Sequence, residues 1–428
     1  MGKKRRTRII SWCFYDFGNS AFTTLVVTFI YATYFTQAIA PDEITGTLLW
    51  SRGISISAIL IALLSPILGA MADQTGLRRR MLISTTIISV AATILLFYPT
   101  EGMIREALIL FVVGNVCYEL GSVFYNSYLP EIAPPEKVGR ISGYGWGFGY
   151  VGGLIIMFIA MVGFVNAEIP WFGLARDGEH IRATNILVAA WFAVFSLPLI
   201  LSVREAPRKG KGSLGKVIND SFNQLKDTYQ HISNYRQIVR LLIARLVYND
   251  GLVTIFAFGA IYAAGTFDFT FEEIMIFGVV LNVTAGLGAF IMGFFDDRLG
   301  GRNTIIVSLF GLIVATLGAL LATNKTLFWA SGILVGIFSG PNQSASRSLM
   351  ARFIPKSQTS EFFGFFAFSG KLTSFLGPLL LGIFTSMFDS QRMGVSVILV
   401  FFVLGLWLLF RVDEEEGKRL ASASSSAT

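Results

Sequence analysis

Long runs of apolar residues alternate with short polar segments along the whole chain. A helix needs about 20 residues to cross a hydrocarbon layer of about 30 Å, and these runs are close to that length or longer. The segments between them are rich in Gly, Pro, Asp and Arg, which is typical of turns between helices. The pattern therefore predicts an all-α membrane protein. Its twelve transmembrane helices are expected at 11–39, 48–71, 81–98, 106–128, 141–164, 184–203, 238–264, 273–295, 303–322, 326–350, 361–388 and 393–411.

The basic residues indicate which ends of these helices face the cytoplasm. Only 14% of the 428 residues are charged and 54% are hydrophobic, whereas about a quarter of residues are charged in a soluble domain. Lys and Arg gather before Ile9, at 78–80 and between 204 and 236, so both termini should be cytoplasmic and the cell (inner) membrane is the expected location. This sidedness explains the net charge of +7 without a nucleic-acid partner. The opposite segments hold Arg105, Arg176, Arg182, Lys325 and Arg392.

Two polar segments divide the chain. Residues 204–237 are basic at first and then have the pattern of an amphipathic helix near 215–232, a form suited to anionic membrane lipids. The last residues begin with a run of acids and end in a Ser/Ala run, which predicts disorder. We therefore expect six-helix bundles at 1–203 and 238–412, a cytoplasmic linker at 204–237, and a disordered cytoplasmic tail at 413–428.

The two halves of the chain repeat each other. A shift of 221 residues superposes Pro134 on Pro355 and Gly143 on Gly364 without a gap. The loops after the second and eighth spans also share the pattern Gly-xxx-Asp-xx-Gly-x-Arg. Gly and Pro are common in membrane helices and can match by chance, but blocks in the same order favour a true repeat. Because six spans separate each element from its repeat, the bundles should have the same orientation in the membrane.

Several spans carry charges at membrane depth. A charged side chain at the centre of a spanning helix costs roughly 2.5–3.5 kcal/mol on insertion scales, so such residues should face protein or water. The third, sixth, ninth and twelfth spans have none, so we expect those helices to face lipid and the others to line a shared interior. The charged positions are Asp16, Arg52, Glu119, Arg245, Asp250, Arg347 and Lys371.

Polar and aromatic residues lie beside these charges. Both halves place a carboxylate, Asp16 or Asp250, next to Tyr, Asn and Gly, which a structural ion pair alone does not explain. Lys371 has two open interpretations, a structural tie to an acid or a ligand to a solute. Gly340-Pro341 predicts a break in the tenth span. The candidate substrate-binding residues are Asp16, Asn19, Glu119, Tyr125, Asn126, Arg245, Tyr248, Asn249, Asp250, Gln343, Arg347 and Lys371.

Together these features resemble the major facilitator superfamily. Within it, the blocks at 15–22, 248–251, 340–348 and 361–364 are similar to the family of the fungal autophagy-related vacuolar amino-acid effluxer and its bacterial relatives. The resemblance implies the major facilitator fold, two parallel-repeat six-helix bundles. It also implies a central cavity lined mainly by the first, fourth, seventh and tenth helices, and amino-acid export as the activity.

The resemblance further implies a cytoplasmic gate. Asp73 and Asp297 should cap helix ends and pair with arginines to hold an outward-facing state. The first loop departs from the usual pattern because Gln74 and Leu77 replace bases, so its contact should depend on the arginines at 78–80. The predicted gate residues are Asp73, Arg78, Arg79, Asp297, Arg298 and Arg302.

These observations predict a secondary active transporter that moves a small polar or zwitterionic solute, an amino acid first of all, by alternating access. Proton coupling through Asp16 or Glu119 is a hypothesis, since burial and a passing cation change the proton affinity of a carboxylate in opposite directions. A lipid or lysolipid translocator and a non-transporting membrane sensor are the alternatives. The two histidines fall in loops and no nucleophile or metal-ligand cluster is present, so we expect no enzyme, cofactor or metal. We expect a monomer whose partners are the solute, membrane lipids and protons.

Overall fold

The computed structural model describes residues 2–203 and 214–426, and within these ranges all regular secondary structure is helical. Ten helices in these described ranges are long and apolar enough to cross a membrane by length and composition. The helices α4 and α13 match the two remaining predicted spans. Arginines at the start of α4 and polar residues along α13 lower the hydropathy of these two.

In the first half, the helices are α1 (Lys3–Ala21), continued by η1 (Phe22–Phe29), α2 (Ile30–Tyr34) and η2 (Phe35–Ile39), then α3 (Glu43–Thr75), α4 (Arg78–Leu95), α5 (Ile104–Asn126), α6 (Leu129–Ile132), η3 (Pro135–Lys137), α7 (Val138–Ala160), η4 (Met161–Val165), η5 (Trp171–Gly173) and α8 (Glu179–Ser202). In the second half, they are α9 (Leu214–Gln230), η6 (Ile232–Tyr235), α10 (Arg236–Phe267), α11 (Phe271–Leu299), α12 (Gly301–Leu321), α13 (Lys325–Phe353), α14 (Thr359–Lys371), α15 (Leu376–Phe388), α16 (Gln391–Leu409) and α17 (Glu414–Ser426).

The chain divides into two compact units. Unit 1 comprises Met1–Leu64, Gln74–Tyr125 and Phe148–Lys211, and unit 2 comprises Ser65–Asp73, Asn126–Gly147 and Gly212–Thr428. This division differs from the predicted bundles, because the end of α3 and the start of α7 belong to unit 2. The helix α9, expected in a separate linker, also belongs to unit 2, whereas linker residues 204–213 lie outside the described residues.

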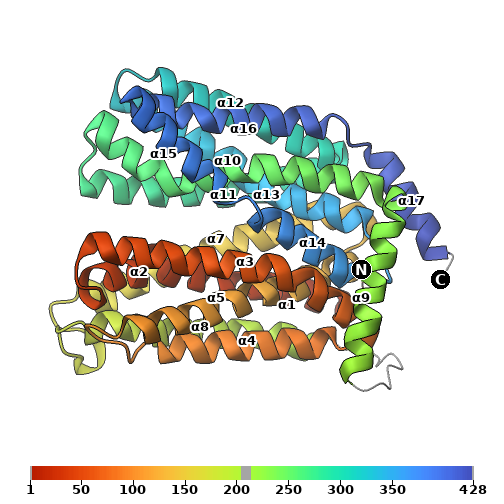
Figure 1. The fold of residues 1–428 in the computed structure, drawn as a ribbon, viewed down its shortest axis with the longest axis horizontal. Helices are drawn as coiled ribbons and strands as arrows, with labels where there is room; N and C mark the ends of the chain where they lie inside the picture. Colours follow the sequence, from red (N-terminus) through yellow and green to blue (C-terminus); the bar gives the residue numbers. More distant parts are fainter. Residues whose placement is uncertain (1, 204–213, 427–428) are drawn as a thin grey trace. The chain divides into compact units, whose positions relative to one another are not determined.

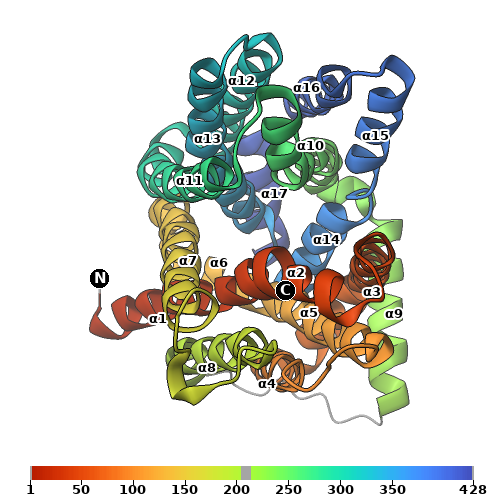
Figure 2. The ribbon, with the colours of Figure 1, turned by 90° about the vertical axis from the view of Figure 1, so that its left-hand side faces the viewer.

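Aromatic side chains form much of the core of unit 1. The ring of Trp50 on α3 lies 4.1 Å from that of Phe111 on α5 and 5.2 Å from that of Phe35. The helix α8 packs against both α1 and α4, and Figures 1 and 2 show these helices running alongside one another. Such large buried rings fix the helix spacing of unit 1 more firmly than aliphatic contacts of the same number.

In unit 2, α13 packs against α11 and α12, while α10 packs against α16. The sequence predicts a break at Gly340-Pro341, but α13 is continuous through this pair, so that prediction is wrong. A proline frees the carbonyl four residues earlier, which here belongs to Ile337. Gly288 of α11 lies directly against this carbonyl and against the ring of Pro341. Close packing of α11 on α13 therefore supports the helix across the proline.

The eleventh span contains an interruption instead. The helix α14 ends at Lys371, α15 begins at Leu376, and residues 372–375 between them form bends and a turn. Pro378 lies in the first turn of α15, where its missing N–H removes one backbone hydrogen bond across the interruption. The single helix predicted at 361–388 is thus two shorter helices.

The described part of the C-terminal segment ends in the helix α17. The sequence predicts disorder at 413–428, and this prediction is wrong for the residues of α17. The acids of this segment find partners in unit 2: a Glu414 oxygen accepts a hydrogen bond from the backbone N–H of Arg302 at 2.9 Å, and Glu416 pairs with Arg236. Although partial burial opposes it, hydrogen bonding to Glu415 and Glu414 raises the pKa of the Lys418 ammonium.

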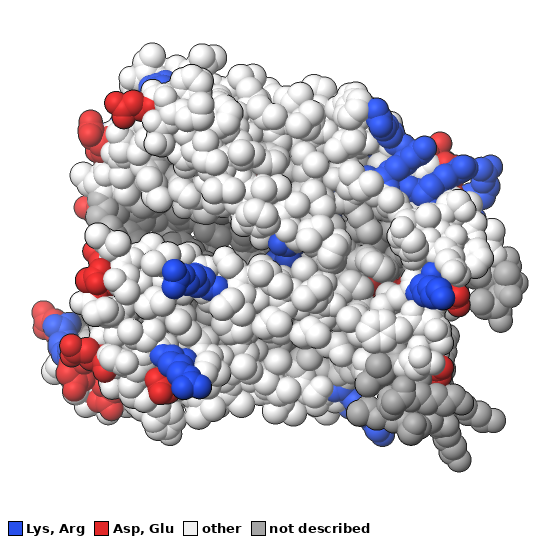
Figure 3. All heavy atoms as spheres, in the orientation of Figure 1, with Lys and Arg blue, Asp and Glu red and all other residues white. Residues whose placement is uncertain are grey.

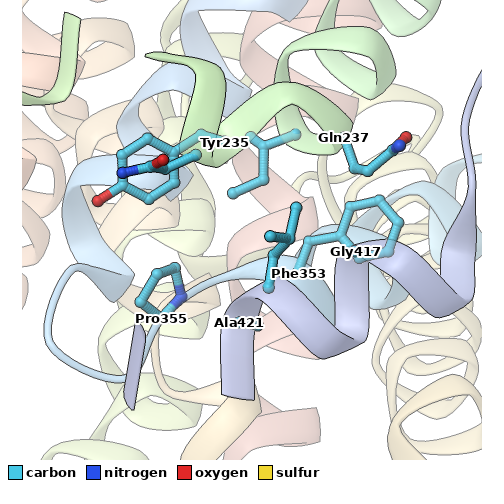
Figure 4. A pocket seen from close by; sticks show the side chains of 9 residues that line it. Tyr235, Gln237, Phe353, Pro355, Gly417 and Ala421 are labelled. Carbon is cyan, nitrogen blue, oxygen red and sulfur yellow. The ribbon is translucent and has the colours of Figure 1, made fainter. Parts of the chain in front are cut away.

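The pocket between α17, the end of α13 and the start of α10 is small (Figure 4). Its volume is about 10 Å³, which is close to the minimum for one water molecule. The phenyl ring of Phe353 packs against Gly417, which fills most of the space between α13 and α17. The pocket is therefore part of the docking of α17 and is too small for a solute.

The surface agrees with a membrane environment. On the face in Figure 3, most charged side chains lie at the ends of the helices and the surface between them is largely uncharged. The four spans predicted to face lipid each expose large apolar side chains. Examples are Ile87 on α4, Leu201 on α8, Val314 on α12 and Val400 on α16.

Candidate functional site

The predicted binding residues are divided between the two units. Unit 1 holds Asp16, Asn19, Glu119 and Tyr125 on α1 and α5. Unit 2 holds Asn126, Arg245, Tyr248, Asn249, Asp250, Gln343, Arg347 and Lys371, from the end of α5 and from α10, α13 and α14. The first, fourth, seventh and tenth spans therefore carry nearly all of them.

In unit 1, two carboxylates lie around one tyrosine. Asp16 on α1 and Glu119 on α5 are both within electrostatic range of the hydroxyl of Tyr118. Both carboxylates are partly exposed, and Asn19, one turn after Asp16, is 4% exposed. This arrangement concentrates negative charge in one part of unit 1, which suits an ammonium group or a proton.

Tyr125 is held in an aromatic stack. Its ring lies between those of Trp12 and Tyr15, with centroid distances of 4.5 and 4.7 Å. The indole N–H of Trp12 donates to the backbone carbonyl of Tyr125 at 3.0 Å, and the hydroxyl of Tyr15 is hydrogen-bonded to that of Thr86. These contacts fix α1 against α5, the two helices that carry the unit 1 carboxylates.

In unit 2, Arg347 is 4% exposed and is held by α7. Its Nε donates to the hydroxyl of Ser142 at 3.0 Å, and its Nη2 donates to the backbone carbonyl of the same residue at 2.7 Å. A weaker contact joins Nη1 to the side-chain oxygen of Asn126 at 3.3 Å, and the guanidinium carbon lies 5.5 Å from the ring centroid of Trp146. The structure thus brings together Arg347 and Asn126, which are both predicted binding residues. The hydrogen bonds to Ser142 of α7 fix the direction of the Arg347 guanidinium.

A second guanidinium is fixed between α10 and α14. Arg245 donates to the backbone carbonyl of Phe366 at 2.8 Å and to the hydroxyl of Ser369 at 2.9 Å, and its guanidinium carbon lies 3.7 Å from the centroid of the Phe366 ring. The side-chain amide of Asn249, one turn further along α10, donates to the carbonyl of Gly370 at 3.2 Å. Two predicted residues therefore attach α10 to the last turns of α14.

The remaining predicted residues of unit 2 lie near these contacts in sequence. The hydroxyl of Tyr248 is hydrogen-bonded to that of Ser346, one residue before Arg347. Gln343 is half-buried one turn earlier on α13, and Lys371 is the last residue of α14. Asp250 is 1% exposed on α10.

The predicted gate residue Asp297 caps the start of α7. Its Oδ1 accepts hydrogen bonds from the backbone N–H groups of Gly139 at 2.8 Å and Arg140 at 3.3 Å. Its Oδ2 accepts from Nε of Arg140 at 2.6 Å. A carboxylate at a helix N-terminus satisfies free N–H groups and interacts favourably with the helix dipole. The Asp297 side chain is 3% exposed, so these hydrogen bonds are largely shielded from water.

Asp73 caps α14 in the matching way. Its two oxygens accept hydrogen bonds from the backbone N–H groups of Ser360 at 3.1 Å and Glu361 at 2.8 Å. Under the shift of 221 residues that relates the two halves, Ser360 and Glu361 correspond to Gly139 and Arg140. The capping of helix ends, which the family resemblance implies for both aspartates, therefore follows the internal repeat.

The four predicted gate arginines lie in different surroundings. Arg298 is exposed, Arg302 donates to the backbone carbonyl of Phe410 at 3.1 Å, and Arg79 donates to that of Ile200 at 3.1 Å. Arg78 is 6% exposed at the start of α4. Within unit 2, the bases on Asp297 come from α7 and α13 instead of its own loop.

Arg352, at the end of α13, is a partner that sequence reasoning missed. It pairs with Asp296 at 2.5 Å and lies 3.6 Å from Asp297 and 3.8 Å from Glu414. Asp296 is 1% exposed and also accepts a hydrogen bond from Ser348. The adjacent acids at 296–297 were a visible signal, but nothing in the sequence identified the base at the end of a different helix. This cluster borders an open basin of about 1360 Å³ at the ends of α11 and α13.

Glu361 is a second residue outside the predicted set. It replaces the arginine that the repeat places at position 140, so it cannot pair with Asp73. Its carboxylate is instead fully buried and accepts hydrogen bonds from Gln224 and, at 2.6 Å, from Thr228, both on α9. The linker helix thereby attaches to the start of α14.

The comparisons with known proteins agree with this geometry. A family model described as "Vacuole effluxer Atg22 like" matches residues 49–422. The chain belongs to this family. The uncharacterized MFS-type transporter YxiO of Bacillus subtilis is 28% identical, over 95% of this chain and 94% of that protein. Autophagy-related protein 22 of Kluyveromyces lactis is 23% identical, over 78% and 75% of the two chains.

Solved structures show the same fold. The proton:xylose symporter XylE gives a TM-score of 0.75 at 14% identity and covers 99% of this chain and 98% of that chain. The outward conformation of FucP gives 0.75 at 11% identity, over 96% and 100%. The Atg22-like chain is thus a transporter with the major facilitator fold and a multi-pass integral membrane protein, as the sequence predicts.

Proposed function

We propose that this Atg22-like protein is a secondary active transporter that exports a zwitterionic solute, an amino acid first of all, by alternating access. The observation that carries the proposal is the separation of charge types. Unit 1 concentrates carboxylates, Asp16 and Glu119, around one tyrosine, whereas unit 2 holds the guanidinium groups of Arg245 and Arg347 in fixed directions. Carboxylates suit the ammonium group of an amino acid and guanidiniums suit its carboxylate.

The comparisons support the direction and the energy source of this proposal. The matching family is described as a vacuole effluxer, which favours export. XylE, which has the same fold, is a proton:xylose symporter, and this favours proton coupling here. The distribution of Lys and Arg supports the cell membrane, with both termini in the cytoplasm. We propose a monomer as the transporting species.

The test is transport by the purified full-length protein in proteoliposomes. Vesicles loaded with one unlabelled amino acid receive the same labelled amino acid outside, and a panel of acidic, basic and neutral amino acids is compared at several pH values. We expect counterflow of at least one of them. Asp16→Asn and Glu119→Gln should reduce its rate at least tenfold, whereas Glu106→Gln, an exposed glutamate on the same helix as Glu119, should not.

Two results would overturn the proposal. Absence of counterflow for every amino acid, together with movement of labelled phospholipid between leaflets, would favour the lipid translocator. Counterflow that is unchanged in both carboxylate variants would show that the unit 1 carboxylates do not contact the solute.

A further inference from the structure

The interruption in the eleventh span faces one side of α10. The hydroxyl of Thr373, within the interruption at 372–375, donates to the backbone carbonyl of Leu246 at 3.4 Å. Beyond the interruption, Gly377 lies so close to Thr254 that a side-chain carbon at this glycine would overlap the threonine hydroxyl. The interrupted segment is therefore attached to α10 on both sides.

Asp250 lies midway between these two contacts. Leu246, Asp250 and Thr254 are four residues apart, so they lie on one side of α10. The carboxylate is 1% exposed, and neither of its oxygens accepts a hydrogen bond by distance and angle from the residues that the structure describes. Thr373 lies beside it, but its hydroxyl is directed to the carbonyl of Leu246. The carboxyl group thus lies at a break in a membrane helix, beside the Thr373 hydroxyl, and makes no hydrogen bond of good distance and angle among the described residues.

A bare carboxylate in this position is not stable. Taking an ion out of water costs several kcal/mol even after the protein relaxes, and this cost is offset only by hydrogen bonds or a counter-charge. A carboxyl group that is neutral, or that holds a cation, avoids the cost. A proton needs only one oxygen, whereas a hard metal cation needs several oxygen ligands. One carboxyl group without neighbouring acids on these helix turns therefore favours a proton.

The neighbouring charges leave this group available. Arg245, one turn before Asp250, is hydrogen-bonded to α14, and Arg347 of α13 is hydrogen-bonded to α7. No ion pair joins Asp250 to any cation in the described parts of the chain. The structure describes these other charged groups on helices packed against α10: Glu361 and Lys371 on α14, Glu272, Glu273, Asp296, Asp297 and Arg298 on α11, Lys325 and Arg352 on α13, Arg392 on α16, and Glu414, Glu415, Glu416, Lys418 and Arg419 on α17.

We propose that Asp250 is the residue that binds and releases the coupling proton. The proposal rests on the proposed transport function and names a site for its proton that differs from Asp16 and Glu119. An O–H bond forms on Asp250 when a proton arrives from water on one side of the membrane. The same bond breaks when the proton leaves to water on the other side. Because the segment at 372–375 is not helical, α14 and α15 can move separately. This movement exposes the carboxyl group first to water on one side of the membrane and then to water on the other.

The first test is independent of transport. Infrared difference spectra of the purified full-length protein are recorded during a pH titration in vesicles. We expect the C=O band of a protonated carboxylic acid to disappear as the pH is raised. The band should be absent in Asp250→Asn and present in Asp268→Asn, which makes the same change at an exposed position at the end of α10. A titrating band that remains in Asp250→Asn would overturn the proposal.

The second test separates exchange from coupling. In proteoliposomes, Asp250→Asn should lower the ratio of accumulation in response to an imposed pH gradient to counterflow of the labelled amino acid at least tenfold. Asp268→Asn should retain both. Full pH-driven accumulation in Asp250→Asn would overturn the proposal, as would accumulation that a Na⁺ gradient drives and a pH gradient does not. The Asp250-dependent band without amino-acid flux would instead contradict only the proposed function.

A folding failure does not remove the test. If Asp250→Asn does not give a monodisperse protein with a cooperative melting transition, Asp250→Glu replaces it. This variant retains an acid in a different position, so the titrating band should remain at a shifted frequency. An unchanged band would show that the signal comes from another carboxyl group, and the proposal would be wrong.

Discussion

Two repeat-related glycines give a quantitative test of the packing in unit 2. A methyl group at Gly364 of α14 would overlap the backbone carbonyl of Ser65 on α3, and one at Gly143 of α7 would overlap that of Ala289 on α11. Gly382 of α15 is the matched control, because a methyl group there has no neighbour within 4 Å. The three sites differ in what surrounds them and share the same substitution, Gly→Ala.

The expected magnitude follows from two opposing effects. Alanine is about 0.8–1.0 kcal/mol more favourable than glycine inside a helix, so Gly382→Ala should raise the free energy of unfolding by up to about 1 kcal/mol. At Gly364 and Gly143 the overlap is with backbone, which cannot rotate away, and overpacking typically costs 1–3 kcal/mol. The helix preference is common to all three sites. The free energies of unfolding of Gly364→Ala and Gly143→Ala should therefore each be lower than that of Gly382→Ala by about 1–3 kcal/mol.

The assay is denaturant and thermal unfolding of the purified variants in one detergent, followed by tryptophan fluorescence. Gly382→Ala should melt at or above the temperature of the parent protein, and the other two should melt several degrees below Gly382→Ala. Equal melting temperatures for Gly364→Ala and Gly382→Ala would refute the close approach of α3 to α14. If only one of Gly364→Ala and Gly143→Ala had a lowered melting temperature, the two repeat-related glycines would not be equally close to their neighbouring helices.

Three further changes probe individual contacts. Asp297→Ala removes the acceptor for two backbone N–H groups and for a guanidinium, so we expect a loss of about 2–4 kcal/mol in unfolding free energy, against about 1 kcal/mol for Arg140→Ala, whose side chain is 30% exposed. Arg347→Lys retains the charge but cannot reproduce the bonds from Nε and Nη2, so counterflow should fall at least tenfold while expression is retained. Tyr15→Phe should cost about 1 kcal/mol of stability, since it removes the hydrogen bond to Thr86 and leaves the aromatic stack in place. The contacts of Asp297 would be contradicted if Asp297→Ala and Arg140→Ala lost the same unfolding free energy. Full counterflow in Arg347→Lys would contradict the role of the Arg347 hydrogen bonds. A Tyr15→Phe protein as stable as the parent would contradict the contribution of the hydrogen bond to Thr86.

The sequence was sufficient for the spans, and the family resemblance implied that Asp73 and Asp297 cap helix ends. The spans follow from hydropathy because a membrane helix must be apolar over a length that the bilayer sets. The resemblance did not say which helix starts the two aspartates contact, and the structure shows that these starts are related by the repeat. Such reasoning succeeds where one physical requirement acts on a whole segment.

Contacts that depend on a neighbouring helix could not be predicted. Gly340-Pro341 and Gly377-Pro378 are the same dipeptide, yet the first lies within a continuous helix and the second lies just after an interruption. The difference depends on Gly288, which supports α13 from another helix and is not visible in the local sequence. The pairing of Arg352 with Asp296 and the order of α17 have the same origin, because long-range partners decide them.

Three helices continue across the boundary between the units. The boundary falls after Leu64 in α3, after Tyr125 in α5 and after Gly147 in α7, and Pro66 lies just beyond it in α3. A continuous helix cannot belong to two independently moving bodies unless it bends or changes its neighbours. Beyond this boundary in α3, a side-chain carbon at Gly69 would overlap the backbone of Ser360 on α14, and one at Gly364 of α14 would overlap the backbone of Ser65. The segments at the end of α3, the end of α5 and the start of α7 therefore pack with unit 2, although the first half of the chain encodes them.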